Sequence, residues 1–103
     1  MKSYRQGDVL LVEVKNIPAG GDDITPENRI IFMWGEVTNH CHAINHPKGK
    51  AVLLDVQAER YLQVLQEATI THEEHAPIIL REGRYQQAFQ VEEQGEEIRR
   101  VED

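Results

Sequence analysis

The chain has 103 residues and a mass of 11.9 kDa, with 40% hydrophobic and 28% charged residues, which predicts one domain and excludes a disordered or fibrous protein. Eleven Lys and Arg against eighteen Asp and Glu give a net charge of −7. This charge argues against binding of long nucleic acid, which requires a basic surface. The single cysteine, Cys41, excludes an intrachain disulfide.

Short apolar runs rich in β-branched residues alternate with turn residues, and no long helical pattern is present. We expect strands over residues 9–14, 29–34, 37–44, 51–56, 57–66, 69–71, 78–80 and 85–91. A loop rich in Pro, Gly and Asp is expected over residues 16–28, and a turn over residues 45–50. Residues 57–66 also fit a helical stripe, but the β-branched residues that follow favour a strand.

These patterns predict an all-β fold, a small barrel or sandwich of about seven short strands. The β-rich domain is expected over residues 1–91, and residues 92–103, with six acids and two bases, as an acidic C-terminal segment. Because exposed sheet edges are often covered by pairing between subunits, we expect a homodimer. No apolar stretch is long enough to span a bilayer and the first residues lack a signal peptide, so a cytoplasmic protein without membrane contact is expected.

The five histidines form two groups, and this clustering is the strongest chemical signal in the sequence. The groups are His40, His42 and His46, and His72 and His75. In a strand over residues 37–44, His40 and His42 point to the same face. Because Pro77 disfavours a helix before it, residues 72–75 are expected to form a bend that turns both rings toward one place.

Three interpretations of these histidines compete. In the first they are ordinary polar residues, which we favour for His46 in its lysine-rich turn. In the second they bind zinc or another divalent metal, with ligands drawn from His40, His42, His72 and His75. A strand with two histidines at this spacing is similar to the cupins, although the downstream glutamate and glycine positions of the cupin pattern are absent here.

The third interpretation is proton transfer without a metal. Cleavage of RNA needs a base that removes the 2′-hydroxyl proton and an acid that protonates the departing 5′ oxygen. Histidines suit both tasks because their ordinary pKa of about 6.5 lets neutral and charged forms coexist near pH 7. Glu73 or Glu74 could orient one ring and favour its imidazolium form. The candidate cations for holding a phosphate are Arg5, Arg81 and Arg84.

Several motifs resemble a family of small bacterial and phage-encoded proteins, over nearly the whole chain. They are YRQGDVLL at residues 4–11, GEVT at 35–38 leading to His40-x-His42, HEEHAPI at 72–78, and Gly83-x-Tyr85. We associate this family with the ring nucleases of type III CRISPR defence, which degrade cyclic oligoadenylates and depend on an active-site histidine. Asn39 stands where that pattern has glycine, and Arg81 where it has proline.

The resemblance implies a dimeric, β-rich enzyme that acts on a small anionic ring, without assigning a role to any single histidine. We therefore expect a metal-independent phosphodiesterase, with His72 and His75 as the first catalytic candidates and His40 and His42 as the next. Such a ring needs only a local positive pocket, and Tyr4 could stack on an adenine. Trp34 could also stack, but inside its apolar run we favour burial in the core. A metal-binding cupin-like enzyme and a non-catalytic ligand-binding β-barrel module stay open as alternatives.

Overall fold

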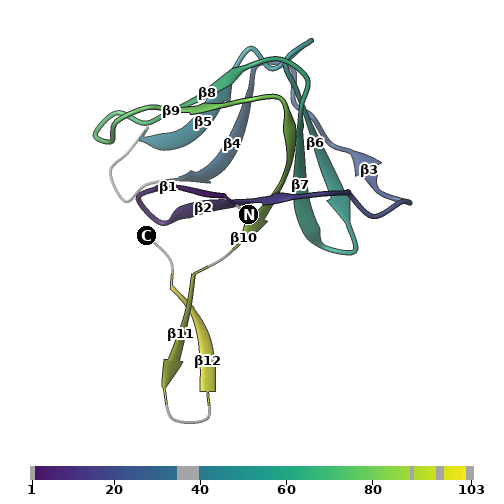
Figure 1. Cartoon of the computed structure of the whole chain (residues 1–103). Coiled ribbons are helices and arrows are strands. Elements are labelled where there is room, and N and C mark those ends of the chain that lie inside the picture. Colours follow the sequence, from purple (N-terminus) through teal and green to yellow (C-terminus); the bar gives the residue numbers. More distant parts are fainter. Residues whose placement is uncertain (1, 35–39, 89, 95–96, 102–103) are drawn as a thin grey trace.

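The computed structural model describes residues 2–34, 40–88, 90–94 and 97–101. Within these ranges all regular structure is β, arranged as two sheets that face each other in a sandwich, together with a separate two-stranded hairpin (Figure 1). The described part of the chain contains no helix long and apolar enough to cross a lipid bilayer. The predicted all-β class is confirmed, and the architecture is a sandwich and not a closed barrel.

The larger sheet has six antiparallel strands in the order β1-β2-β10-β7-β6-β3. Their bounds are β1 Ser3–Gln6, β2 Val9–Val14, β3 Asp22–Asp23, β6 Ala51–Val56, β7 Glu59–Val64 and β10 Gly83–Ala88. Gly7, with a φ of 59°, stands first in the two-residue turn from β1 to β2, a position that favours glycine. Alternation along β2 then directs Val9 and Leu11 into the core.

The smaller sheet has four antiparallel strands in the order β4-β5-β8-β9. Their bounds are β4 Arg29–Trp34, β5 Cys41–Asn45, β8 Ala68–Thr71 and β9 Ile78–Leu80. Along β8, Ala68 and Ile70 are buried while Thr69 and Thr71 are exposed, as expected of a strand with one face on a core. The strands β11 (Gln90–Gln94) and β12 (Glu97–Val101) form the hairpin, which pairs with neither sheet.

The hydrophobic core fills the space between the two sheets. Its largest fully buried apolar side chains are Tyr85, Leu11, Ile30, Ile44, Leu53, Leu62, Ile70 and Leu80. Side chains also tie one sheet to the backbone of the other, because Gln87 Nε2 donates to the carbonyl oxygen of Phe32 at 3.0 Å and Arg60 Nη2 to that of Ile31 at 3.3 Å. Burial of one such apolar side chain stabilises the fold by about 1.5–3 kcal/mol.

The structure has more strands than the sequence pattern predicted. Twelve strands lie in the described residues, because β1, β3, β11 and β12, which are short or polar, add to the eight expected ones. Trp34, which we expected in the core, is 53% exposed at the end of β4, with the guanidinium of Arg29 at 5.6 Å from its ring centroid. Part of the strand expected over residues 37–44 lies outside the described residues, and β5 begins at Cys41.

The two-residue turn from β6 to β7 holds two non-glycine residues in the left-handed region. Gln57 and Ala58 have φ angles of 52° and 66°, the two positive values that a type I′ turn requires. A side chain with a Cβ atom costs about 1–2 kcal/mol in this left-handed region, and Asn-Gly is the favoured pair. The double variant Gln57→Asn/Ala58→Gly should therefore raise the free energy of unfolding in urea by about 1 kcal/mol.

Ala88→Gly is the matched control, because Ala88 lies in β10 with ordinary strand backbone. There the added freedom of glycine should lower the stability by about 0.5–1 kcal/mol. A double turn variant that is no more stable than the unmodified protein would contradict the strain that we assign to this turn.

Candidate functional site

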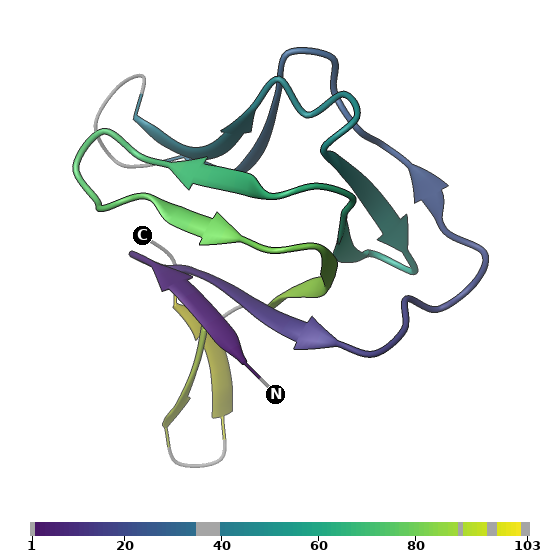
Figure 2. The same ribbon diagram turned by 45° about the horizontal axis from the view of Figure 1, so that its top comes forward.

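Two segments far apart in the sequence meet at one end of the smaller sheet. β5 begins directly after His40, and the bend after β8 runs from His72 to His75 before β9 begins. Figure 2 shows the β8–β9 connection at the same end of the sheet as the start of β5. Antiparallel pairing of β5 with β8, with Ala43 opposite Thr71, places His42 and His72 near each other just beyond that pair.

The structure brings together four of the five histidines, which we call the histidine cluster: His40, His42, His72 and His75. The ring centroids of His42 and His72 are 4.2 Å apart, those of His72 and His75 4.6 Å, and those of His42 and His75 5.4 Å. His40 lies at 5.9 Å from His72, nearly perpendicular to it. His46 belongs to the turn after β5, at the other end of that strand. The predicted convergence of the two groups is therefore present.

A glutamine that our reading of the sequence overlooked determines the state of the most buried histidine. Gln6 Nε2 donates to the carbonyl oxygens of Ile70, at 3.0 Å, and Ala76, at 2.9 Å. These two acceptors fix the orientation of the amide, so Gln6 Oε1, 2.8 Å from His42 Nδ1, must accept a hydrogen bond. His42 therefore carries a proton on Nδ1, and in its neutral form its lone pair is on Nε2.

Burial keeps His42 in that neutral form. The side chain is 1% exposed, and this burial lowers its pKa from 6.5 to about 4. Positive charge on His72 or His75 would lower the pKa further, and the Glu73 carboxylate partly opposes the shift. At neutral pH the imidazole of His42 is therefore uncharged, with its lone pair on Nε2.

His72 has the opposite tautomer. The backbone N–H of Glu74 donates to His72 Nδ1 at 3.0 Å, so this nitrogen holds a lone pair and the proton of the neutral ring is on Nε2. His72 is half-buried and His75 is exposed, which leaves both accessible to a ligand from solvent. His42 therefore has a lone pair on its Nε2, and the neighbouring His72, in its neutral form, has an N–H group on its Nε2.

Two carboxylates border the histidine cluster. Glu73 Oε1 accepts the backbone N–H of Cys41 at 2.9 Å, which fastens the bend to the start of β5. Hydrogen bonds from its own N–H and from that of Cys41 hold the pKa of Glu73 below its usual value, and His40 and His72 lower it further. Glu74 Oε2 lies 3.9 Å from His40 Nδ1, a buried atom without a hydrogen-bond partner in the described part of the chain.

The predicted substrate-binding residues lie in different places. Tyr4 packs against the core and meets the Tyr85 ring edge-on at 5.8 Å, so part of its surface is used structurally. Arg5 is exposed on the face of β1 opposite to Gln6, because side chains alternate along the strand. Arg5 is the predicted cation that shares a strand with Gln6, but its side chain points to the other face of that strand.

Arg84 and Arg81 lie away from the histidine cluster. Arg84 pairs with Val14 at the end of β2 remote from Gln6, and its Nη1 donates to the carbonyl oxygen of Lys15 at 3.1 Å. Arg81 follows the end of β9 that is remote from the bend, and its carbonyl oxygen accepts the Tyr85 hydroxyl at 2.8 Å. The local positive pocket that we expected from these two residues is not formed at the cluster in this chain.

Three of the histidines also meet the geometric requirement of a metal site. One nitrogen each from His42, His72 and His75 lies within 4.8 Å of the other two. His40, which the metal interpretation also included, is not part of this set. Three histidine ligands with an open fourth position are typical of catalytic zinc sites.

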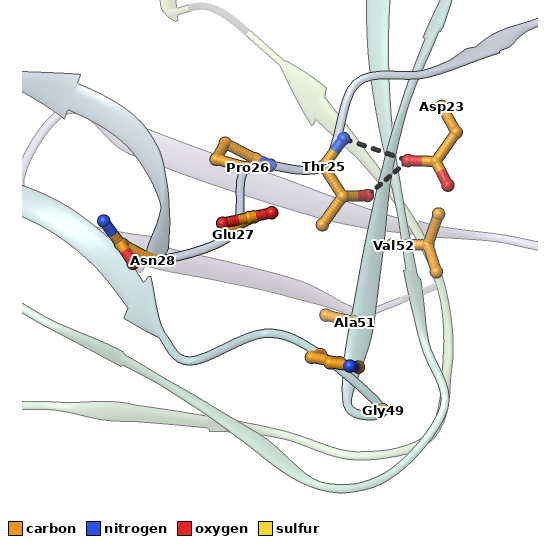
Figure 3. Close-up of a pocket in the computed structure, with 9 residues that line it drawn as sticks. Asp23, Thr25, Pro26, Glu27, Asn28, Gly49, Ala51 and Val52 are labelled. Carbon is orange, nitrogen blue, oxygen red and sulfur yellow. Dashed lines mark hydrogen bonds between the residues drawn. The ribbon is translucent and has the colours of Figure 1, made fainter.

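A hollow of about 630 Å³ lies at the opposite end of β5 from the histidine cluster (Figure 3). It is lined by Asp23, Thr25, Pro26, Glu27, Asn28, Lys48, Gly49, Ala51 and Val52. Asp23 Oδ1 accepts the backbone N–H of Thr25 at 2.9 Å and also its hydroxyl, and these bonds lower the pKa of Asp23. They order the loop before β4, and they supply no acid–base pair or ligand set comparable to the histidine cluster.

Comparison of the sequence with known protein families identifies a match. A family model described as Domain of unknown function (DUF8820) matches residues 5–90. The chain belongs to this family. The DUF8820 match includes Gln6 and the whole histidine cluster, and it ends at the first residue of β11. No curated protein and no solved structure matches the chain.

The buried neutral state of His42 predicts how stability depends on pH. Its folded pKa of about 4 lies below the unfolded value near 6.5, so between these values the unfolded chain binds a proton that the folded protein excludes. Stability should therefore fall as the pH decreases from 7 to 4. The shift corresponds to about 3 kcal/mol, which we reduce to about 2 kcal/mol because solvent screens the neighbouring charges.

Urea unfolding at pH 7 and pH 4 measures this loss, with His42→Asn as the comparison. Asparagine retains an N–H group near the position of Nδ1 but cannot titrate, so this variant should lose about 2 kcal/mol less over the same range. Equal pH dependence in the two proteins would show that His42 is not held neutral by the fold.

Proposed function

We propose that the histidine cluster is the active site of a ring nuclease, a metal-independent phosphodiesterase that opens cyclic oligoadenylates. His42 Nε2 takes the proton of a ribose 2′-hydroxyl, and that oxygen attacks the adjacent phosphorus. The bond from phosphorus to the 5′ oxygen breaks, leaving a 2′,3′-cyclic phosphate on one end. His72, protonated on both ring nitrogens in the substrate complex, gives the proton of its Nε2 to the departing oxygen, which becomes the 5′-hydroxyl of the other end.

The observation that carries this proposal is the pair of opposite tautomers. Gln6 leaves the lone pair of His42 on Nε2, and the Glu74 N–H leaves the proton of His72 on Nε2, in rings whose centroids are 4.2 Å apart. General base and general acid are the two functions that cleavage by a 2′-hydroxyl requires, and each contributes about 10²–10⁴ in rate. In their neutral forms the two rings thus place a lone pair and an N–H group close together.

The neighbouring charges match these functions. As a general acid His72 must carry a proton on both nitrogens, so its Nδ1 releases the Glu74 N–H in the charged ring, and the Glu73 carboxylate nearby can balance that charge. A low pKa makes His42 a weak base, and the negative charge of a bound phosphate raises that pKa toward the useful range. Charge on the phosphate itself would be met by ring N–H groups of His75 and His40, which lie next to the reacting pair.

A small cyclic substrate fits the charge of the chain better than a long one. With a net charge of −7 the protein repels a polyanion that covers its surface, whereas a ring of a few nucleotides contacts one pocket. The motifs that resemble ring nucleases, including YRQGDVLL and HEEHAPI, contain Gln6 and the 72–75 bend, so the resemblance and the site involve the same residues. A cytoplasmic homodimer belongs to this proposal.

The direct test is incubation of the full chain, in EDTA, with rings of three to six adenylates, followed by separation of the products. We expect cleavage to linear products that end in a 2′,3′-cyclic phosphate. His72→Asn and His42→Asn should each lower the rate by about 10²–10⁴, because each removes one proton transfer.

His46→Asn is the matched control, because this exposed residue outside the cluster has a φ of 52°, which asparagine tolerates. It should cleave at the unmodified rate. Absence of turnover for every ring would refute the proposal, and tight binding without a product would favour the non-catalytic module. Activity that EDTA abolishes and a divalent metal restores would favour the metal-dependent alternative.

A further inference from the structure

We propose that His42, His72 and His75 form a binding site for one divalent transition-metal ion such as Zn²⁺, and that the bound ion blocks the site by occupying the nitrogens that proton transfer uses. The blocking effect rests on the proposed function, whereas the binding site does not.

The spacing of the three nitrogens is close to that of a zinc site. Zn–N bonds of about 2.0–2.1 Å in a tetrahedron place ligand nitrogens about 3.3 Å apart. The nitrogens of His42, His72 and His75 already lie within 4.8 Å of one another. His75 is exposed and His72 half-buried, so small rotations of these two rings can close the remaining distance around the fixed ring of His42.

The surroundings of His42 are those of a metal ligand. Histidines that bind metals almost always donate the other ring N–H to a carboxylate, a carbonyl or water, which fixes the tautomer and directs the lone pair. Gln6 Oε1 supplies that acceptor at 2.8 Å, and its own amide is anchored to the backbone of Ile70 and Ala76. His42 is therefore oriented in advance for a metal at Nε2.

Metal binding requires a change at His72. Its Nδ1 lone pair now accepts the N–H of Glu74, and coordination through either nitrogen removes that hydrogen bond. The N–H group belongs to an exposed residue, so water can replace the lost acceptor. The bend at residues 73–75 is the part of the site that must adjust.

The charges around the site favour a cation. Glu73, whose carboxyl is ionised by its hydrogen bonds to backbone N–H groups, lies beside His72 and His40, and Glu74 lies 3.9 Å from His40. Arg81 and Arg84, the two cations that would oppose a metal ion here, are held at the far ends of β9 and β2. A divalent ion therefore enters a region with two carboxylates and three imidazole ligands.

Titration of the metal-free, untagged full chain with Zn²⁺ alone, against a chromophoric chelator, tests the site without any substrate. We expect one ion per chain, and binding at least 100-fold weaker in His75→Asn and in His72→Asn. His75→Asn is the decisive variant because its side chain is exposed and its loss does not threaten folding. His46→Asn is the control and should bind as the unmodified chain does.

Turnover of cyclic oligoadenylate with and without one equivalent of Zn²⁺ tests the block. We expect the ion to lower the rate at least 10-fold and EDTA to restore it. Equal Zn²⁺ affinity in His75→Asn and the unmodified chain would overturn the site, and unchanged turnover by zinc-loaded protein would overturn the block. If the metal-free protein cleaves no ring, the proposed function fails, and the zinc titration by itself still decides whether the site exists.

Discussion

The hydrogen bonds of one buried amide determine the chemistry of this site. A buried polar group must find partners, and Gln6 Nε2 finds two carbonyl oxygens, one at the end of β8 and one in the connection to β9. Its oxygen is then available only as an acceptor for His42 on β5. The same side chain therefore ties the first strand of the larger sheet to the smaller sheet and places the lone pair of a buried imidazole on a defined atom.

This constraint makes proton transfer and metal binding two uses of one arrangement. Nε2 of His42 is a base toward a hydroxyl group and a ligand toward a metal ion, and in both cases its direction is set by the amide on the other side of the ring. His72 differs because its hydrogen-bond partner is an exposed backbone N–H in a bend, which can be exchanged for water. The cluster combines one rigid histidine with others that can adapt to a ligand.

Local patterns were enough to predict the fold class and the convergence of the histidines. Strand alternation placed His40 and His42 together, and Pro77 indicated a bend beside them. The partner of His42 was not predictable in that way, because Gln6 is 36 residues away and reaches it only through contact between two sheets. The sequence signal that could have indicated this partner is Gln6 itself, a polar residue at an inward-facing position of a short strand. The positions of the arginines were not predictable for a similar reason. Arg84 lies opposite Val14 because of the strand register, which the local sequence pattern does not reveal.

The most direct test of this account is a measurement of the histidine ring nitrogens by long-range ¹H–¹⁵N NMR at neutral pH. The account predicts that His42 is neutral with its proton on Nδ1 and stays neutral down to about pH 5, while neutral His72 carries its proton on Nε2. Protonation of His42 with an ordinary pKa near 6.5, or a proton on its Nε2 at neutral pH, would contradict the ordering of the site by Gln6.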